Sequence, residues 1–174
     1  RRQRQMCIRD SKGIVFIHQE LSLARELTVA ENIYLGELPR KRLGLVDWQA
    51  LFDKTNTILQ RLKVRFDART RVGDLSIANQ QMVEIARALT HEAKAVIFDE
   101  PTASLTDAEK SVLFEVIEDL KSHGVGIIYI SHRMEEIFKI TDRISVLRDG
   151  QYRGTLETAK TTEEDVTQLM IGRK

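Results

Sequence analysis

The sequence predicts an α/β domain with a mostly parallel sheet flanked by helices. Short apolar runs alternate along the chain with helical patterns, and this order is typical of parallel strands joined by helical connections. Two runs, residues 95–98 and 127–130, are apolar throughout and have the length of a strand. The chain has 174 residues and 42% hydrophobic content, which is enough for one domain with a sizeable core.

The first half of the chain predicts one strand followed by helices. Residues 13–17 read as a strand, residues 28–35 as a short helical patch, and residues 40–44 as a basic loop with a glycine. Asp47 can cap the next helix. Its expected face consists of Trp48, Leu51, Phe52, Thr55, Ile58, Leu59 and Leu62. Residues 75–76 open another helix, whose helically spaced residues are Met82, Ile85, Ala86 and Leu89.

The second half predicts two buried strands, a hairpin and more helices. The strand at 95–98 ends in Asp99-Glu100-Pro101, where the proline disfavours helical geometry at Glu100. A helix from Asp107 is expected to end near Gly124, before a second buried strand at 126–130. Its expected core face consists of Leu113, Val116, Ile117 and Leu120. The remaining expected elements are a short helix containing Met134, Ile137 and Phe138, a hairpin of 144–147 and 151–156 around Asp149-Gly150, and a helix at 161–170.

Charge and cysteine content narrow the class of protein. There are 27 basic and 26 acidic residues, a balance that does not indicate a dedicated nucleic-acid binder. The single cysteine, Cys7, allows no internal disulfide, so a reducing, cytosolic compartment is the default expectation. No apolar run is long enough to span a bilayer, and no apolar stretch follows the basic N-terminus as a secretory signal requires. Association with a membrane is therefore expected to run through a partner protein.

Polar groups with possible chemistry follow three of the predicted strands and precede one helix. Asp99 and Glu100 end a buried strand, where one carboxylate can hold Mg²⁺ and the other can polarise a water that attacks a phosphate. The loop at 75–81 opens a helix, whose free N–H groups and dipole suit a phosphate. His132 and Gln19 each follow a strand. Taken singly, each group is more often structural: a solvated strand end, a serine N-cap at Ser76, or a packed side chain.

The order and spacing of these groups together resemble the ABC ATPase family. The stretches VGDLSIANQQMVEIARAL, AVIFDEPTASLTD and GIIYISHRMEEIF are similar to the monosaccharide-importer branch, which includes ribose, galactose, xylose and arabinose importers. HQELSLARELTVAENIYLG, VLRDG and MIGRK are similar to the same branch, and the ribose importer's ATPase looks nearest. The resemblance covers about residues 12–174.

The resemblance implies a role for each matching residue. Gln19 matches the Q-loop glutamine, which senses Mg²⁺ and the attacking water. Ser76 and Ala78 lie in the signature, which contacts the γ-phosphate of ATP held by the opposite domain, and we group Gln80 with these nucleotide-binding residues. Asp99 matches the Walker B aspartate that serves Mg²⁺. The two residues with catalytic roles are Glu100, which matches the general base, and His132, which matches the switch histidine.

The chain departs from the family pattern in three places. The signature glycines are replaced by Ile77 and Ala78, and its glutamine by Asn79; alanine has less backbone freedom than glycine. The aspartate of the D-loop, here residues 103–107, falls on Thr106. No G-x-x-x-x-G-K-[ST] phosphate loop occurs in the sequence, although the family has one before the Q-loop. We therefore expect a partial ATPase domain, inactive and poorly folded alone, that lacks the N-terminal strands and the phosphate loop.

These inferences define an expected organisation and function. Residues 1–11 are expected to be a non-native or disordered stretch, and 12–174 a partial ABC ATPase domain with a helical subdomain at about 20–92. The expected function is ATP hydrolysis with Mg²⁺ that energises monosaccharide import from the cytoplasmic face of the cell membrane. The expected partners are a second ABC domain, a membrane permease that contacts residues 19–36, and indirectly a sugar-binding protein. Two alternatives stay open: a soluble ABC ATPase without a permease, and a non-hydrolysing binding or regulatory module.

Overall fold

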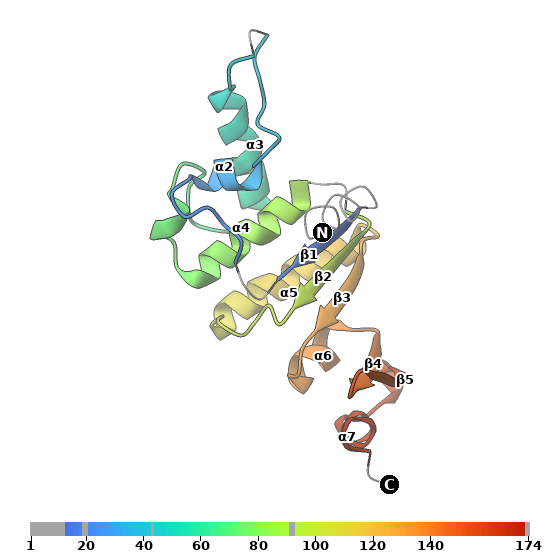
Figure 1. The fold of residues 1–174 in the computed structure, drawn as a ribbon. Coiled ribbons are helices and arrows are strands. Elements are labelled where there is room, and N and C mark those ends of the chain that lie inside the picture. The colour runs from blue at the N-terminus through green and yellow to red at the C-terminus, as the bar shows by residue number, and fades with distance from the viewer. Residues whose placement is uncertain (1–12, 19–20, 43, 91–92, 173–174) are drawn as a thin grey trace. The chain divides into compact units, whose positions relative to one another are not determined.

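A computed structural model describes residues 13–18, 21–42, 44–90 and 93–172 of the chain. They belong to two compact units, Arg1–Ile130 and Ser131–Lys174, which we call the first and second units (Figure 1). Residues 1–11 and Gln19 lie outside the described residues, so the expectation for the N-terminal stretch stays a prediction. Among the described residues, no helix is both long and apolar enough to cross a membrane.

The first unit contains the predicted parallel sheet. Its strands are β1 (Ile14–Ile17), β2 (Ala95–Asp99) and β3 (Gly126–Ile130), in the spatial order β1-β2-β3 (Figure 1). Ala95 pairs with Ile14 on one side and with Gly126 on the other, and both pairings are parallel. The carboxyl ends of β1, β2 and β3 therefore meet at one edge of the sheet, which is where ligands bind in open α/β sheets. The predicted α/β class is confirmed.

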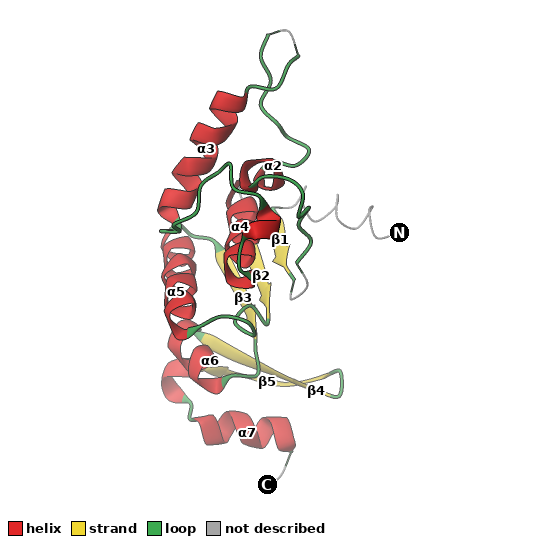
Figure 2. Cartoon of the chain, turned by 90° about the vertical axis from the view of Figure 1, so that its left-hand side faces the viewer, coloured by secondary structure: helices red, strands yellow, loops and turns green. Residues whose placement is uncertain are grey.

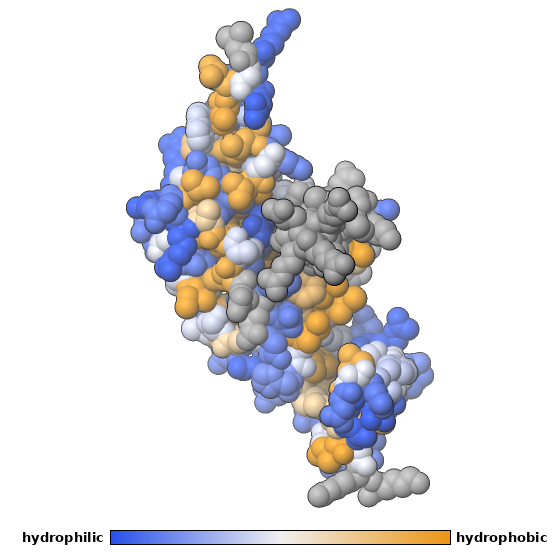
Figure 3. Space-filling model, in the orientation of Figure 1, coloured by the Kyte–Doolittle hydropathy of each residue, from blue (hydrophilic) through white to orange (hydrophobic). Residues whose placement is uncertain are grey.

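The prediction that β3 is a buried strand is wrong. Its residues alternate between exposed and half-buried positions, and Ile128 and Ile130 are 53% and 44% exposed. The physical reason is its place in the sheet, because in the described part of the chain β3 pairs with β2 and lies at the sheet's edge. Figure 3 shows apolar surface over this part of the sheet. The apolar run in the sequence thus predicted the strand correctly, but it did not predict how far its side chains are exposed.

Helix α5 (Asp107–Ser122) packs against β3. Thr106 is its N-cap, and Thr106 and Glu109 each accept a hydrogen bond from the other's backbone, which satisfies two N–H groups that the helix leaves unpaired. Gly124 follows the helix with φ +80°, a left-handed conformation that suits glycine at a helix end. The predicted core face is confirmed: Leu113, Val116, Ile117 and Leu120 are buried, together with Phe114.

The described residues of the first unit form three further helices: α2 (Val29–Ile33), α3 (Trp48–Arg61) and α4 (Ile77–Thr90). They contact one another, and α4 also contacts β1 (Figures 1 and 2). Asp47 caps α3 as predicted, since its carboxylate accepts a hydrogen bond from the Ala50 N–H at 3.2 Å. A short 3-10 helix, Val72–Asp74, precedes α4. The predicted bounds of the helical subdomain stay a prediction.

The second unit contains α6 (Met134–Ile140), the antiparallel strands β4 (Arg143–Arg148) and β5 (Gln151–Glu157), a 3-10 helix (Thr158–Lys160) and α7 (Glu163–Ile171). Asp149 and Gly150 have φ angles of 54° and 72°, as a two-residue hairpin turn with two left-handed positions requires. The predicted hairpin is therefore confirmed. The buried core of this unit is Ile144, Val146 and Val166, against which Met134, Ile137, Phe138, Leu156 and Leu169 pack.

Candidate functional site

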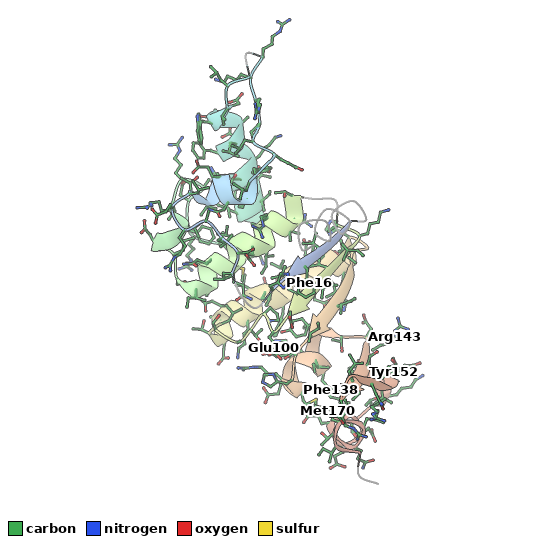
Figure 4. All side chains as sticks on the ribbon, in the orientation of Figure 1. Phe16, Glu100, Phe138, Arg143, Tyr152 and Met170 are labelled. Carbon is green, nitrogen blue, oxygen red and sulfur yellow. The ribbon has the colours of Figure 1, made fainter. Side chains whose placement is uncertain are left out.

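The predicted carboxylate pair lies at the carboxyl end of β2. Asp99 is the last residue of the strand and pairs with Ile130 of β3. Glu100 follows with φ 49°, a left-handed conformation that is uncommon for a residue with a side chain (Figure 4). Its N–H donates a hydrogen bond to the Ile130 carbonyl at 2.9 Å. The edge strand thus holds the turn at Glu100, and such held strain is common at functional sites.

The loop after Glu100 is held by its own backbone and by α4. The Ala103 N–H donates to the Glu100 carbonyl at 3.4 Å, and the Leu105 N–H to the Thr102 carbonyl at 3.2 Å. The buried side-chain amide of Gln81, on α4, donates to the Pro101 carbonyl. The carboxylate pair is therefore built from two strands and one helix of the same unit.

The predicted signature segment forms the start of α4. Ser76 is exposed, and its Oγ accepts a hydrogen bond from the Asn79 N–H at 3.3 Å, so it does cap the helix. Ala78 is buried. Gln80 is also buried, and its Nε2 donates to the Leu75 carbonyl at 2.9 Å. Of these three predicted nucleotide-binding residues, Ser76 is the one whose side chain faces solvent.

Neither of the two remaining predicted residues belongs to the described part of the first unit. His132 belongs to the second unit, where it is exposed and comes just before α6. Next to it, the Ser131 Oγ accepts a hydrogen bond from the Arg133 N–H at 3.0 Å. Gln19 lies outside the described residues. The structure therefore brings Asp99, Glu100 and the start of α4 into one unit.

Mg²⁺ and ATP would both need oxygen or nitrogen donors from this site. Carboxylate oxygens of the Asp99 type suit Mg²⁺, which usually keeps several waters. In the part of the chain that the structure describes, no group of three or more His, Cys, Asp or Glu side chains could hold a metal ion. An ion at Asp99 would take most of its ligands from water or phosphate, and this role of Asp99 stays a prediction. The residues present fit the metal, whereas the phosphate-loop motif is not part of this sequence.

Sequence reasoning missed two polar residues that shape this site, Gln81 and Glu84. Both are buried on α4, among Met82, Val83 and Ile85. Each bonds to a loop that follows a strand: Gln81 to Pro101 after β2, and Glu84 to Ser22 after β1. Their spacing of three residues places them on one face of the helix, so polar residues at helical spacing inside an apolar helix were a usable signal.

The comparisons with known proteins agree with this geometry. The model of the ABC transporter family matches residues 2–103. A ribose/galactose/methyl galactoside import ATP-binding protein of Agrobacterium fabrum is 47% identical over 162 residues, 93% of this chain and 32% of that protein. The chain thus spans about a third of the length of this curated relative.

Two solved structures show the same fold. The ADP conformation of an ATP-binding cassette of an ABC transporter matches with a TM-score of 0.69 at 27% identity, over 91% of this chain and 65% of that one. A dimeric, post-hydrolysis ATP-binding cassette bound to ADP and Pi matches with a TM-score of 0.73 at 21% identity, over 88% of this chain and 67% of that one. Because the family match covers more than half of its residues, this chain belongs to the ABC transporter family, as its series of motifs predicted.

Proposed function

We propose that this chain is part of the ATP-hydrolysing subunit of a monosaccharide importer. The observation on which the proposal rests is the 47% identity, over 93% of the chain, with a protein named for ribose, galactose and methyl galactoside import. The named sugars indicate the class of substrate that the importer would carry. The carboxylate pair at the sheet edge supports the same proposal, since hydrolysis of ATP needs a group that orients water beside one that serves Mg²⁺.

In this proposal Glu100 acts as the general base and orients the water that attacks the γ-phosphate in line. The Glu100 backbone is left-handed and is held by the hydrogen bond to Ile130, so the position from which its side chain extends is fixed. Asp99 would hold Mg²⁺ largely through water, together with Gln19. Mg²⁺, when bound, neutralises charge on the phosphates.

Ser76 and His132 of this chain would also contact ATP. Ser76, exposed at the start of α4, would contact the γ-phosphate of ATP held by a second ABC domain, with the N–H groups of the helix's first turn beside it. Ala78 and Gln80 are buried, so they would support this contact through the backbone of the first turn. His132 would stabilise the charge of the γ-phosphate.

The proposal also fixes the partners and the location. ATP would lie between this domain and a second ABC domain, and the motion of that pair would drive a membrane permease. Residues 19–36 are the proposed contact with the permease, and a sugar-binding protein would take part indirectly. The subunit would be peripheral, on the cytoplasmic face of the cell membrane.

The test is Glu100→Gln in the complete gene product that contains this chain, assembled with its permease. General-base catalysis typically contributes about 10²–10⁴-fold, so kcat should fall at least about 100-fold while ATP binding persists. Glu164→Gln, at an exposed position of α7, is the matched control and should leave kcat unchanged.

Other outcomes would favour the alternatives. A normal rate of hydrolysis with Glu100→Gln would show that Glu100 is not the general base. Hydrolysis by a protein that never co-purifies with a membrane subunit would favour a soluble ABC ATPase. A wild-type protein that binds ATP and does not hydrolyse it would favour the binding-module alternative.

A further inference from the structure

Besides Gln80, which bonds to Leu75 just before the helix, α4 holds two buried polar side chains that bond to segments distant in the sequence, one turn apart. Gln81 is 5% exposed and Glu84 is 4% exposed. A buried polar group destabilises the fold unless it is hydrogen-bonded, and a buried carboxylate does so more strongly. The hydrogen bonds of Gln81 and Glu84 are therefore expected to constrain the positions of the segments that they bond to, at Pro101 and Ser22.

Glu84 holds the segment that follows β1. The Ser22 N–H donates to Glu84 Oε1 at 2.7 Å, and the Ser22 Oγ donates to the same oxygen at 3.0 Å. Arg87 completes the group, because its guanidinium lies 3.7 Å from Glu84 Oε1 and donates to the Ser22 Oγ at 3.1 Å. Ser22 comes three residues after Gln19 in the sequence, so this group fixes the chain just beyond the predicted Q-loop glutamine.

Gln81 holds the segment that follows β2 in the same way. Its Nε2 donates to the carbonyl of Pro101, the residue directly after Glu100. On the other side of Glu100, its own N–H is bonded to Ile130. The proposed base is thus held on one side by the sheet and on the other by α4.

We propose that Gln81 and Glu84 are positioning residues that make α4 a rigid link between three parts of the site. The start of the helix presents Ser76, Gln81 holds the loop at Glu100, and Glu84 holds the segment after Gln19. Because one helix makes all three connections, a displacement of α4 moves the two loops together. The consequence for hydrolysis rests on the proposed function, whereas the link itself rests on these contacts.

The link can be tested without any activity, by the exchange rates of single backbone amides of this chain within the complete gene product. Glu84→Gln keeps an oxygen that can accept the Ser22 N–H, whereas Glu84→Met has similar size and no such oxygen. Exchange of the Ser22 amide should become at least about tenfold faster with Glu84→Met and stay within about threefold of wild type with Glu84→Gln, because exchange follows local opening. Equal exchange in the two variants would overturn the proposal.

Gln81 has a corresponding test. Gln81→Met removes the donor to Pro101, so the Ala103 and Leu105 amides of that loop should exchange at least about tenfold faster. Gln60→Met, at an exposed position of α3, is the matched control and should change neither loop. Unchanged exchange of the Ala103 and Leu105 amides in Gln81→Met would show that Gln81 does not hold the loop after Glu100.

Ser22→Ala covers the case in which the Glu84 variants do not fold. This variant removes the Oγ donor and keeps the N–H. The backbone amide at position 22 should therefore exchange a few-fold faster than in the wild type. An unchanged exchange rate would count against the link.

Kinetics of the complete gene product separate this proposal from the proposed function. Glu84→Met should lower kcat at least about tenfold with the KM for ATP within about twofold, and Glu84→Gln should recover most of the rate. Normal hydrolysis with Glu100→Gln would defeat the proposed role of Glu100 as the general base and leave the exchange results standing. Unaltered exchange in Glu84→Met would defeat the link, whatever the rate of hydrolysis.

Discussion

Helices α3 and α4 have the same length, 14 residues, and lie in contact in the same unit, yet they are buried very differently. The buried residues of α3 are Leu51, Thr55 and Leu59, one stripe along the helix. Those of α4 are Ala78, Gln80, Gln81, Met82, Val83, Glu84, Ile85, Ala86 and Ala88, which surround it. A helix with one buried stripe covers a core, whereas a helix that is buried all round lies inside one.

The difference shows in how the two helices use their polar groups. On α3 these groups bond within the helix, as the side-chain amide of Gln49 does with Asp53, or bond at the surface, as Arg61 does in its exposed ion pair with Asp119 of α5. On α4, Gln81 and Glu84 bond to loops far away in the sequence. Removing a buried polar residue of α4 is therefore expected to disturb the segments it bonds to, whereas removing the exposed Arg61 of α3 should cost little.

The largest effect that distinguishes the helices is expected from one isoleucine in each. Ile85→Ala in α4 removes a fully buried side chain and should destabilise its region by roughly 2–4 kcal/mol. Ile58→Ala in α3 removes a half-buried side chain and should cost about 1 kcal/mol. Native-state hydrogen exchange of the α2–α4 region measures both. Equal costs would mean that the two helices are equally embedded.

The sequence predicted those parts of the fold that depend on local patterns. The run at 95–98 became β2, Asp47 caps α3, and Asp149-Gly150 makes the hairpin turn. It did not predict the exposure of Ile128 and Ile130, because burial of a strand depends on which elements lie beside it. Periodicity gives the one buried face of α3, but it does not show that α4 is buried on every side.

The same limit applies to the site. Adjacent carboxylates after an apolar strand predicted the position of Asp99 and Glu100 at the sheet edge. The left-handed backbone of Glu100 depends on its bond to Ile130, a contact across 30 positions of sequence that no local pattern encodes. Gln80 was expected to bind nucleotide and instead bonds to Leu75, so its role there stays a prediction.

An intermediate effect should separate the caps of the two helices. Asp47→Ala removes the side chain that caps α3 and should cost about 1 kcal/mol of local stability without changing hydrolysis. Ser76→Ala removes a longer capping bond of 3.3 Å, so its cost should not exceed about 1 kcal/mol, while kcat of the complete gene product should fall. Exchange of the first-turn amides measures the caps, and ATPase assays measure the rate. Normal hydrolysis with Ser76→Ala would mean that Ser76 is only a cap.

The smallest effect is expected from an exposed pair at the end of α3. The Lys63 amine donates to Glu115 Oε2 at 2.7 Å, and this hydrogen bond and the charge of Glu115 raise the pKa of Lys63. A raised pKa in the folded state means that the pair's contribution is complete below the ordinary lysine pKa, about 10.4, and is lost as the pH rises through the raised value.

Glu115→Gln should therefore lower the pKa of Lys63 toward its ordinary value, as measured by NMR titration of the lysine side chain. Added salt should reduce the shift in the wild type, because exposed charges are screened. The Ser22 amide, protected by the buried Glu84, should keep its exchange rate over the same range of salt. If salt leaves the pKa of Lys63 unchanged but changes the exchange rate of the Ser22 amide, the contrast between an exposed α3 and a buried α4 is wrong.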